Sequence, residues 1–193
     1  MTTMRNTIAA GALVAVSTAA LTGCSTEDKD SPDVQSSKLT ASTSAERVDE
    51  SSARSLQKEL GDVGIEKFTA ADYKPGKVKH IVLFRFKQGT SLAKQAEVMQ
   101  KFRELKGQAT RNEKPYIVSL ESGTQTSGEG AGLNMKQGFI VTFASEGDRN
   151  YYVGTPIVTD AKFYDKTHQS FKEFVGPLLD KSGAVVLDFT EGK

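Results

Sequence analysis

The fold is decided by the stretch Val78-Lys79-His80-Ile81-Val82-Leu83-Phe84-Arg85-Phe86-Lys87. Successive side chains of a strand point to opposite faces of a sheet. One face therefore carries Val78, His80, Val82, Phe84 and Phe86, whereas the other carries Ile81 and Leu83 between Lys79 and Arg85. A strand that is apolar on both faces is typical of a sheet interior covered on both sides. The stretch predicts a strand over residues 78–87.

Helical and strand periods alternate through the rest of the chain. We expect Thr90 or Ser91 to cap the first helix, Ser145 to cap a short one, and Pro177 to kink the last. The expected elements are a helix over 92–107, strands over 116–122 and 138–144, helices over 145–152 and 163–179, and a strand over 184–189. This β-α-β-β-α-β order predicts an α+β domain with the ferredoxin-like fold.

A sheet of this kind carries helices on one face only, so its other face needs a cover. We expect that open face to carry Val82, Phe84, Val141 or Phe143, and Leu187. Two copies packed sheet against sheet would bury these residues, which predicts a homodimer that forms an α/β barrel. The alternative is a monomer in which residues 58–75 cover the sheet.

Residues 1–23 have the three parts of a secretory signal peptide. Arg5 supplies a charge, an apolar run follows over residues 7–21, and small residues precede Cys24. The run is shorter than the ~20 residues of a membrane-spanning helix. Leu21-Thr22-Gly23-Cys24 resembles the bacterial lipobox, in which the cysteine is acylated and becomes the mature N-terminus. The alternative is an ordinary secretory signal that happens to precede a cysteine.

Acyl chains on Cys24 would change the chain from soluble to membrane-anchored. The lipobox resemblance therefore implies a lipid-anchored protein of the bacterial cell envelope. Ser25 follows the cysteine. In enterobacteria-like sorting an Asp there directs retention in the inner membrane, so Ser25 favours the outer membrane where the organism has one. Because Cys24 is the single cysteine, an intrachain disulfide is excluded.

Composition places the folded unit in the last two thirds of the chain. All aromatic residues, 10 Phe and 5 Tyr, lie at or after Phe68. A core needs large apolar side chains, so the first third cannot build one. We expect a signal peptide over 1–23, a disordered tether over 24–57, a partly ordered lead-in over 58–77 in which Phe68 and Tyr73 contact the domain, and the domain itself over 78–191.

Charge gives no reason to expect a nucleic-acid partner. The chain has 25 Lys and Arg against 24 Asp and Glu, and removing residues 1–23 takes away only Arg5. A neutral chain without a basic run lacks the electrostatic footprint of a nucleic-acid-binding protein.

Several stretches of the domain resemble the stress-response A/B barrel family. Residues 80–87 are similar to the opening strand of that family, and residues 168–179 and 186–189 to its closing helix and strand. Residues 119–123 and 139–143 fit the middle strands. The resemblance covers the whole domain and implies a dimer in which two sheets form one barrel.

One group within this family, the plant olivetolic acid cyclase type, closes a polyketide chain by an aldol-type reaction without a cofactor. The resemblance implies that Tyr152 and His168 would do acid–base work, with His80 of the first strand in the same cavity. The chain departs from the family here, because Thr155-Pro156 stands where the family often has His-Pro.

The resemblance leaves open whether the chain is an enzyme. One hypothesis is a non-catalytic, envelope-anchored binding or stress-associated barrel whose partner is a small hydrophobic ligand. The other is a cofactor-free cyclase or lyase that acts on a hydrophobic carbonyl compound through His168, Tyr152 and His80. A cofactor-independent oxygenase, as in the related antibiotic-monooxygenase barrels, is disfavoured because the chain has no Trp. We expect no cofactor, and no metal, because the two histidines lack an ordered carboxylate partner.

Replacement of Cys24 tests the lipid anchor. Cys24→Ala removes the thiol that would be acylated, so the chain should accumulate as uncut precursor and take up no radiolabelled palmitate. The wild-type chain should take up the label and lose residues 1–23. Absence of label from the wild-type chain would contradict lipidation.

Overall fold

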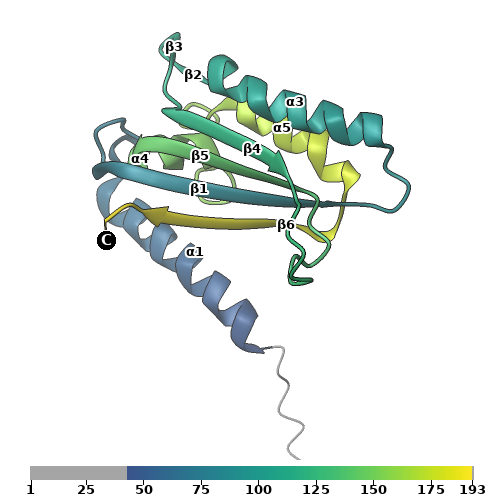
Figure 1. Ribbon diagram of the computed structural model, residues 1–193. Coiled ribbons are helices and arrows are strands. Elements are labelled where there is room, and N and C mark those ends of the chain that lie inside the picture. Colours follow the sequence, from purple (N-terminus) through teal and green to yellow (C-terminus); the bar gives the residue numbers. More distant parts are fainter. Residues whose placement is uncertain (1–42, 193) are drawn as a thin grey trace, which may run out of the picture. The chain divides into compact units, whose positions relative to one another are not determined.

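The computed structural model describes residues 43–192, and the side chains from residue 51 onward. One antiparallel sheet forms its centre (Figure 1). Its strands are β1 (Pro75–Phe86), β4 (Ser119–Thr124), β5 (Gln137–Ser145) and β6 (Leu179–Thr190), in the spatial order β4-β5-β1-β6. The expected ferredoxin-like α+β fold is confirmed, with β1 as an inner strand.

Helices cover one face of this sheet (Figure 1). They are α3 (Leu92–Gln108), α4 (Glu146–Val153) and α5 (Lys166–Val175). Ser91 and Ser145 cap α3 and α4 as expected, since each hydroxyl accepts a backbone N–H three residues on. The last helix is shorter than predicted: α5 ends at Val175, and a 3₁₀ turn, η1 (Gly176–Leu178), follows because Pro177 cannot continue an α-helix.

The two sheet faces are the reverse of what the sequence analysis assigned. Val82, Phe84, Val141 and Phe143 were expected on the open face, but all four are buried in the core beneath the helices. Of that set only Leu187 lies on the open face, where it pairs with Ile81 across the β1–β6 ladder. Alternation shows which residues share a face but not which face the helices cover, and this is why the assignment was wrong.

The open face remains without cover in the described part of the chain. On the edge strand β6, Val185, Leu187 and Phe189 are 40%, 58% and 47% exposed. The monomer alternative placed residues 58–75 over this face. Instead, Phe68 and Tyr73 of that segment pack with Val158 in a second, smaller hydrophobic cluster.

Helical structure begins earlier than the expected tether allows. α1 (Thr43–Val63) and α2 (Ile65–Phe68) precede the sheet, so the boundary at residue 57 is too late. Leu56 and Leu60 of α1 pack on the cluster around Phe68, which anchors the helix to the domain. The lead-in contacts α4 so closely that a Cβ at Gly147 would collide with the backbone of Ala70. The contact of Phe68 and Tyr73 with the domain was expected.

Two smaller differences concern β4 and β6. A short hairpin of β2 (Thr110–Arg111) and β3 (Lys114–Pro115) precedes β4, which therefore starts at Ser119 rather than at residue 116. β6 starts at Leu179 rather than at residue 184, because Leu179 pairs with Phe86 on the far side of a bulge. Within residues 43–192, no helix combines the length and hydrophobicity needed to cross a membrane. The signal peptide and Cys24 lie outside the described residues.

Candidate functional site

The three residues expected to do acid–base chemistry lie together on the helix-covered side of the sheet. His80 comes from β1, Tyr152 from the last turn of α4, and His168 from the first turn of α5. The Asp165 carboxylate caps α5 by accepting the backbone N–H of His168 at 3.0 Å, which fixes the start of the helix. All three side chains are buried.

The rings of the three residues are in contact. Tyr152 and His168 stack with ring centroids 3.7 Å apart and planes 16° apart, whereas His80 meets Tyr152 edge-on at 5.7 Å. His168 Nδ1–H donates a hydrogen bond to the backbone oxygen of Tyr152 at 2.7 Å. This bond locks the histidine to the end of α4. The Tyr152 hydroxyl is buried and has no hydrogen-bond partner among the described residues.

Burial holds His168 and Tyr152 in their neutral forms. It lowers the pKa of His168 from 6.5 to about 3, and the backbone hydrogen bond offsets this only in part. Burial also raises the pKa of Tyr152 well above 10, with a further contribution from the negative charge of Asp165. An efficient general acid or base has a pKa near the working pH. In this closed arrangement, neither group meets that condition.

The sequence analysis missed a carboxylate that partners His80. His80 Nδ1–H donates to Asp188 Oδ1 at 2.7 Å, and Arg149 Nη1 donates to Asp188 Oδ2 at 2.6 Å. Burial alone would raise the pKa of Asp188, but the hydrogen bonds and charges of His80 and Arg149 outweigh it and lower the pKa. The available signal was register, since Asp188 stands directly opposite His80 in the β1–β6 ladder.

The cavity beside this cluster is small. It has a volume of about 50 Å³ and lies next to Arg149 and Asp188. Its other lining residues come from α1 and α2 and from the end of α4 and the segment after it: Leu56, Phe68, Asn150, Val153, Gly154, Ile157 and Val158. Tyr152 and His168 do not line it. The lead-in and residues 153–158 therefore leave little free space beside the cluster of His80, Tyr152 and His168.

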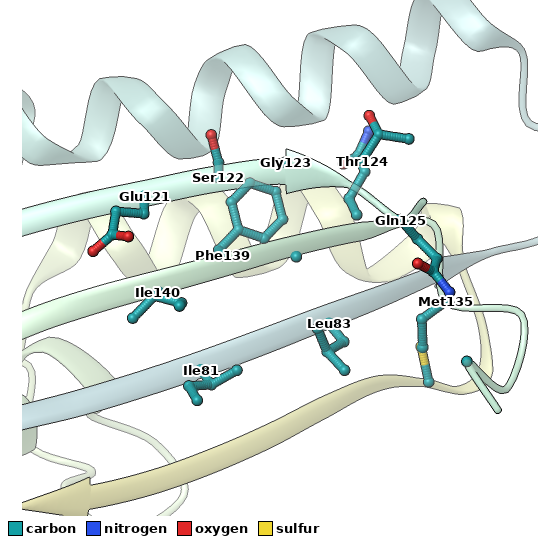
Figure 2. Close-up of a pocket in the computed structure, with 13 residues that line it drawn as sticks. Ile81, Leu83, Glu121, Ser122, Gly123, Thr124, Gln125, Met135, Phe139 and Ile140 are labelled. Carbon is teal, nitrogen blue, oxygen red and sulfur yellow. The ribbon is translucent and has the colours of Figure 1, made fainter. Parts of the chain in front are cut away.

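A much larger hollow lies on the open face of the sheet. Its volume is about 530 Å³, within the range of small-molecule sites. Ile81, Leu83 and Ile140 form its apolar wall, as Figure 2 shows. Two glycines stand opposite each other in its floor, Gly123 of β4 and Gly138 of β5. The absence of side chains at this pair leaves the space.

The loop between β4 and β5 forms one end of the hollow. Gln125 and Met135 line that end (Figure 2). The loop is held to the sheet because Lys136 N–H donates to Phe84 O at 2.7 Å and Arg85 Nη1 donates to Leu133 O at 3.1 Å.

The described residues contain no group of three or more His, Cys, Asp or Glu side chains arranged to hold a metal ion. Asp188 adds one carboxylate to His80, but Arg149 occupies its other oxygen. The cluster is therefore a charge-paired network rather than a set of free ligands.

Acidification tests the buried state of His168. A histidine whose pKa is about 3 when folded and 6.5 when unfolded contributes stability that is full above pH 6.5 and lost as the pH falls toward 3. Between pH 7 and pH 5 this group should remove about 2 kcal/mol from the free energy of unfolding. His168→Asn cannot titrate, so its urea-measured loss over that interval should be smaller by this amount. An equal loss in both proteins would contradict the burial of a neutral imidazole.

The chain is similar to several solved structures. Three solved structures illustrate the likeness: an Arabidopsis thaliana protein at 23% identity, a hydroxynitrile lyase from Passiflora edulis at 21%, and a Dabb family protein with a ferredoxin-like fold from Mesorhizobium loti at 18%. The alignments cover 60%, 62% and 61% of this chain and 96%, 96% and 99% of those chains. Their TM-scores are 0.48, 0.48 and 0.44.

Among curated proteins, none matches the chain. The sequence pattern of one family, the stress responsive A/B barrel domain (Dabb), matches residues 78–191. These are the boundaries expected for the domain, and the match spans more than half of the 193 residues. The chain therefore belongs to the stress responsive A/B barrel domain family.

Proposed function

We propose that this chain is a non-catalytic binding module of the bacterial cell envelope, anchored by a lipid at Cys24, that takes a small hydrophobic ligand on the open face of its sheet. The observation that carries the proposal is the location of the larger hollow. The 530 Å³ space lies on the open face, whereas the His80, Tyr152 and His168 cluster faces the other way and is closed. A role in the stress response is part of the proposal through the family.

The hollow has the lining of a binding site rather than of a catalytic one. Its surface is mostly apolar, with Ile81, Leu83, Ile140 and Met135 around the glycine floor. Neither histidine of the chain reaches it. Apolar walls with a few polar groups are typical of sites that hold a ligand by burying its surface.

The module is proposed to act as a homodimer. The open face presents Val185, Leu187 and Phe189 on the edge strand β6, and an exposed apolar patch of this kind is typical of an interaction surface. A two-fold axis would bring the same patch of two chains together. The hollow would then face the inside of the barrel, where water is excluded from the ligand.

The anchor and location rest on the N-terminal sequence. Leu21-Thr22-Gly23-Cys24 follows an apolar run and supports acylation of Cys24, with Ser25 favouring the outer membrane. The membrane is then a partner of the lipid and not of the folded domain, and the ligand would be bound at the envelope.

Native mass spectrometry of the chain from residue 25 onward tests dimer and ligand together. The wild type should give twice the protomer mass plus a small molecule. Leu187→Asp places an unpaired carboxylate in the proposed interface, so the monomer mass should appear. The control Leu92→Asp changes a side chain at the start of α3 that is 83% exposed, and it should stay dimeric.

Filling the hollow tests whether the ligand binds there. A Cβ at Gly123 would meet nothing within 4 Å, so Gly123→Leu should occupy the space without disturbing the sheet. This variant should keep the dimer mass and lose the small molecule. A monomeric wild type would contradict the dimer, and a small molecule retained in Gly123→Leu would contradict the site.

A second candidate function is a cofactor-free cyclase or lyase that acts on a hydrophobic carbonyl compound. One observation favours it: the structure brings His80, Tyr152 and His168 into contact and gives His80 a carboxylate partner in Asp188. In such an enzyme, His168 and Tyr152 would exchange protons with the substrate. The surroundings of the cluster would first have to open.

Proton exchange discriminates between the two functions. A cyclase or lyase of this type removes a proton next to a carbonyl, so it should speed deuterium uptake by 2-heptanone in D₂O. His168→Ala should then reduce the acceleration by about 10²–10⁴-fold. The binding module predicts no acceleration over buffer by the wild type. NMR of the ketone gives the rate.

A further inference from the structure

Glu121 gives the apolar hollow a single charged wall. It lies in the middle of β4 and pairs with Ile140, which in turn pairs with Ile81, so the three side chains form one row across the open face. Figure 2 shows Glu121 at one end of the hollow, with Gln125 and Met135 at the other. The two ends are four residues apart along the chain, about 13 Å for an extended strand.

The carboxylate of Glu121 has no hydrogen bond or ion pair with any side chain that the structure describes. Two cations of the same face, Lys79 and Arg85, are already engaged. Lys79 Nζ lies 3.2 Å from Glu191 and 3.0 Å from the Thr142 hydroxyl. Arg85 binds Asp180 and the backbone of the β4–β5 loop. The negative charge at the hollow is therefore not balanced from within this chain.

This combination selects a class of ligand. We infer that the hollow binds a small amphiphilic amine, whose alkyl chain lies over Gly123 and Gly138 and whose ammonium group pairs with Glu121. The inference rests on the proposed function and adds the chemistry of the ligand. Glu121 is exposed in the single protomer, and the second copy of the proposed dimer would enclose its carboxylate beside the apolar walls. A carboxylate enclosed in this way is costly unless a cation meets it, and in this inference the ligand supplies that cation.

Charge and apolar burial also predict how tightly other ligands should bind. A fatty acid of equal length would place its carboxylate beside Glu121 and be repelled. An alcohol would bury the same chain but gain no ion pair. Each additional buried CH₂ should tighten binding about fourfold for all three, until the chain fills the hollow.

Titration calorimetry of the chain from residue 25 onward tests this ranking with octylamine, octanol and octanoate. Octylamine should bind at least tenfold more tightly than octanol, and octanoate should bind most weakly. Glu121→Gln should abolish the preference for the amine and leave octanol unchanged. Glu129→Gln is the matched control, because Glu129 lies in the β4–β5 loop but does not line the hollow.

The outcomes separate the inference from the proposed function. Equal binding of octylamine and octanol, with no effect of Glu121→Gln, would overturn the amine and leave an apolar ligand site. Dissociation of the dimer by Glu121→Gln, without any amine preference, would also overturn it, because the cation would then come from the second copy. If Gly123→Leu leaves the binding of all three compounds intact, the site itself is wrong and the proposed function fails with it.

Discussion

The structure depends on a strand that is apolar on both faces. β1 sends Val82 and Phe84 into a core beneath three helices, and it sends Ile81 and Leu83 to the opposite side. A ferredoxin-like unit has helices for only one of these faces. The face without helices determines the other main properties of the domain. It leaves β6 with exposed apolar side chains, it offers the surface on which the proposed second copy would pack, and it contains a hollow of about 530 Å³.

Much of the fold could be predicted because it depends on the local periodicity of hydrophobic residues. Hydrophobic spacing and the serine caps gave the order of strands and helices, and the family's sequence pattern matches the expected domain. The choice of face could not be predicted, because a period of two marks Val82 and Phe84 as neighbours without saying what covers them. The start of α1 was missed for a related reason: its polar sequence gives a weak signal, and Leu56 is held by packing against residues distant in sequence.

The candidate sites, like the fold, could be predicted only in part from the sequence. The resemblance predicted that His80, Tyr152 and His168 would lie together, and they do. Their closure could not be foreseen, because it results from the packing of Phe68, which precedes the domain, against Val158, which lies in none of the stretches that carried the resemblance. The hollow could not be predicted either. It lies where Gly123 of β4 and Gly138 of β5 stand opposite each other, and this register is known only from the folded sheet. Burial separates the two sites: it keeps His168 and Tyr152 neutral and enclosed, whereas the glycine floor is accessible.

The central claim is that ligands enter on the open face and not beside the histidines. Methyl-labelled NMR during titration with octanol reads the two sides of the sheet independently. The account predicts that the methyl signals of Ile81, Leu83 and Ile140 shift with the ligand while those of Val153 and Val158, beside the closed cluster, remain in place. Shifts at Val153 and Val158 with the open-face methyl groups unmoved would contradict it.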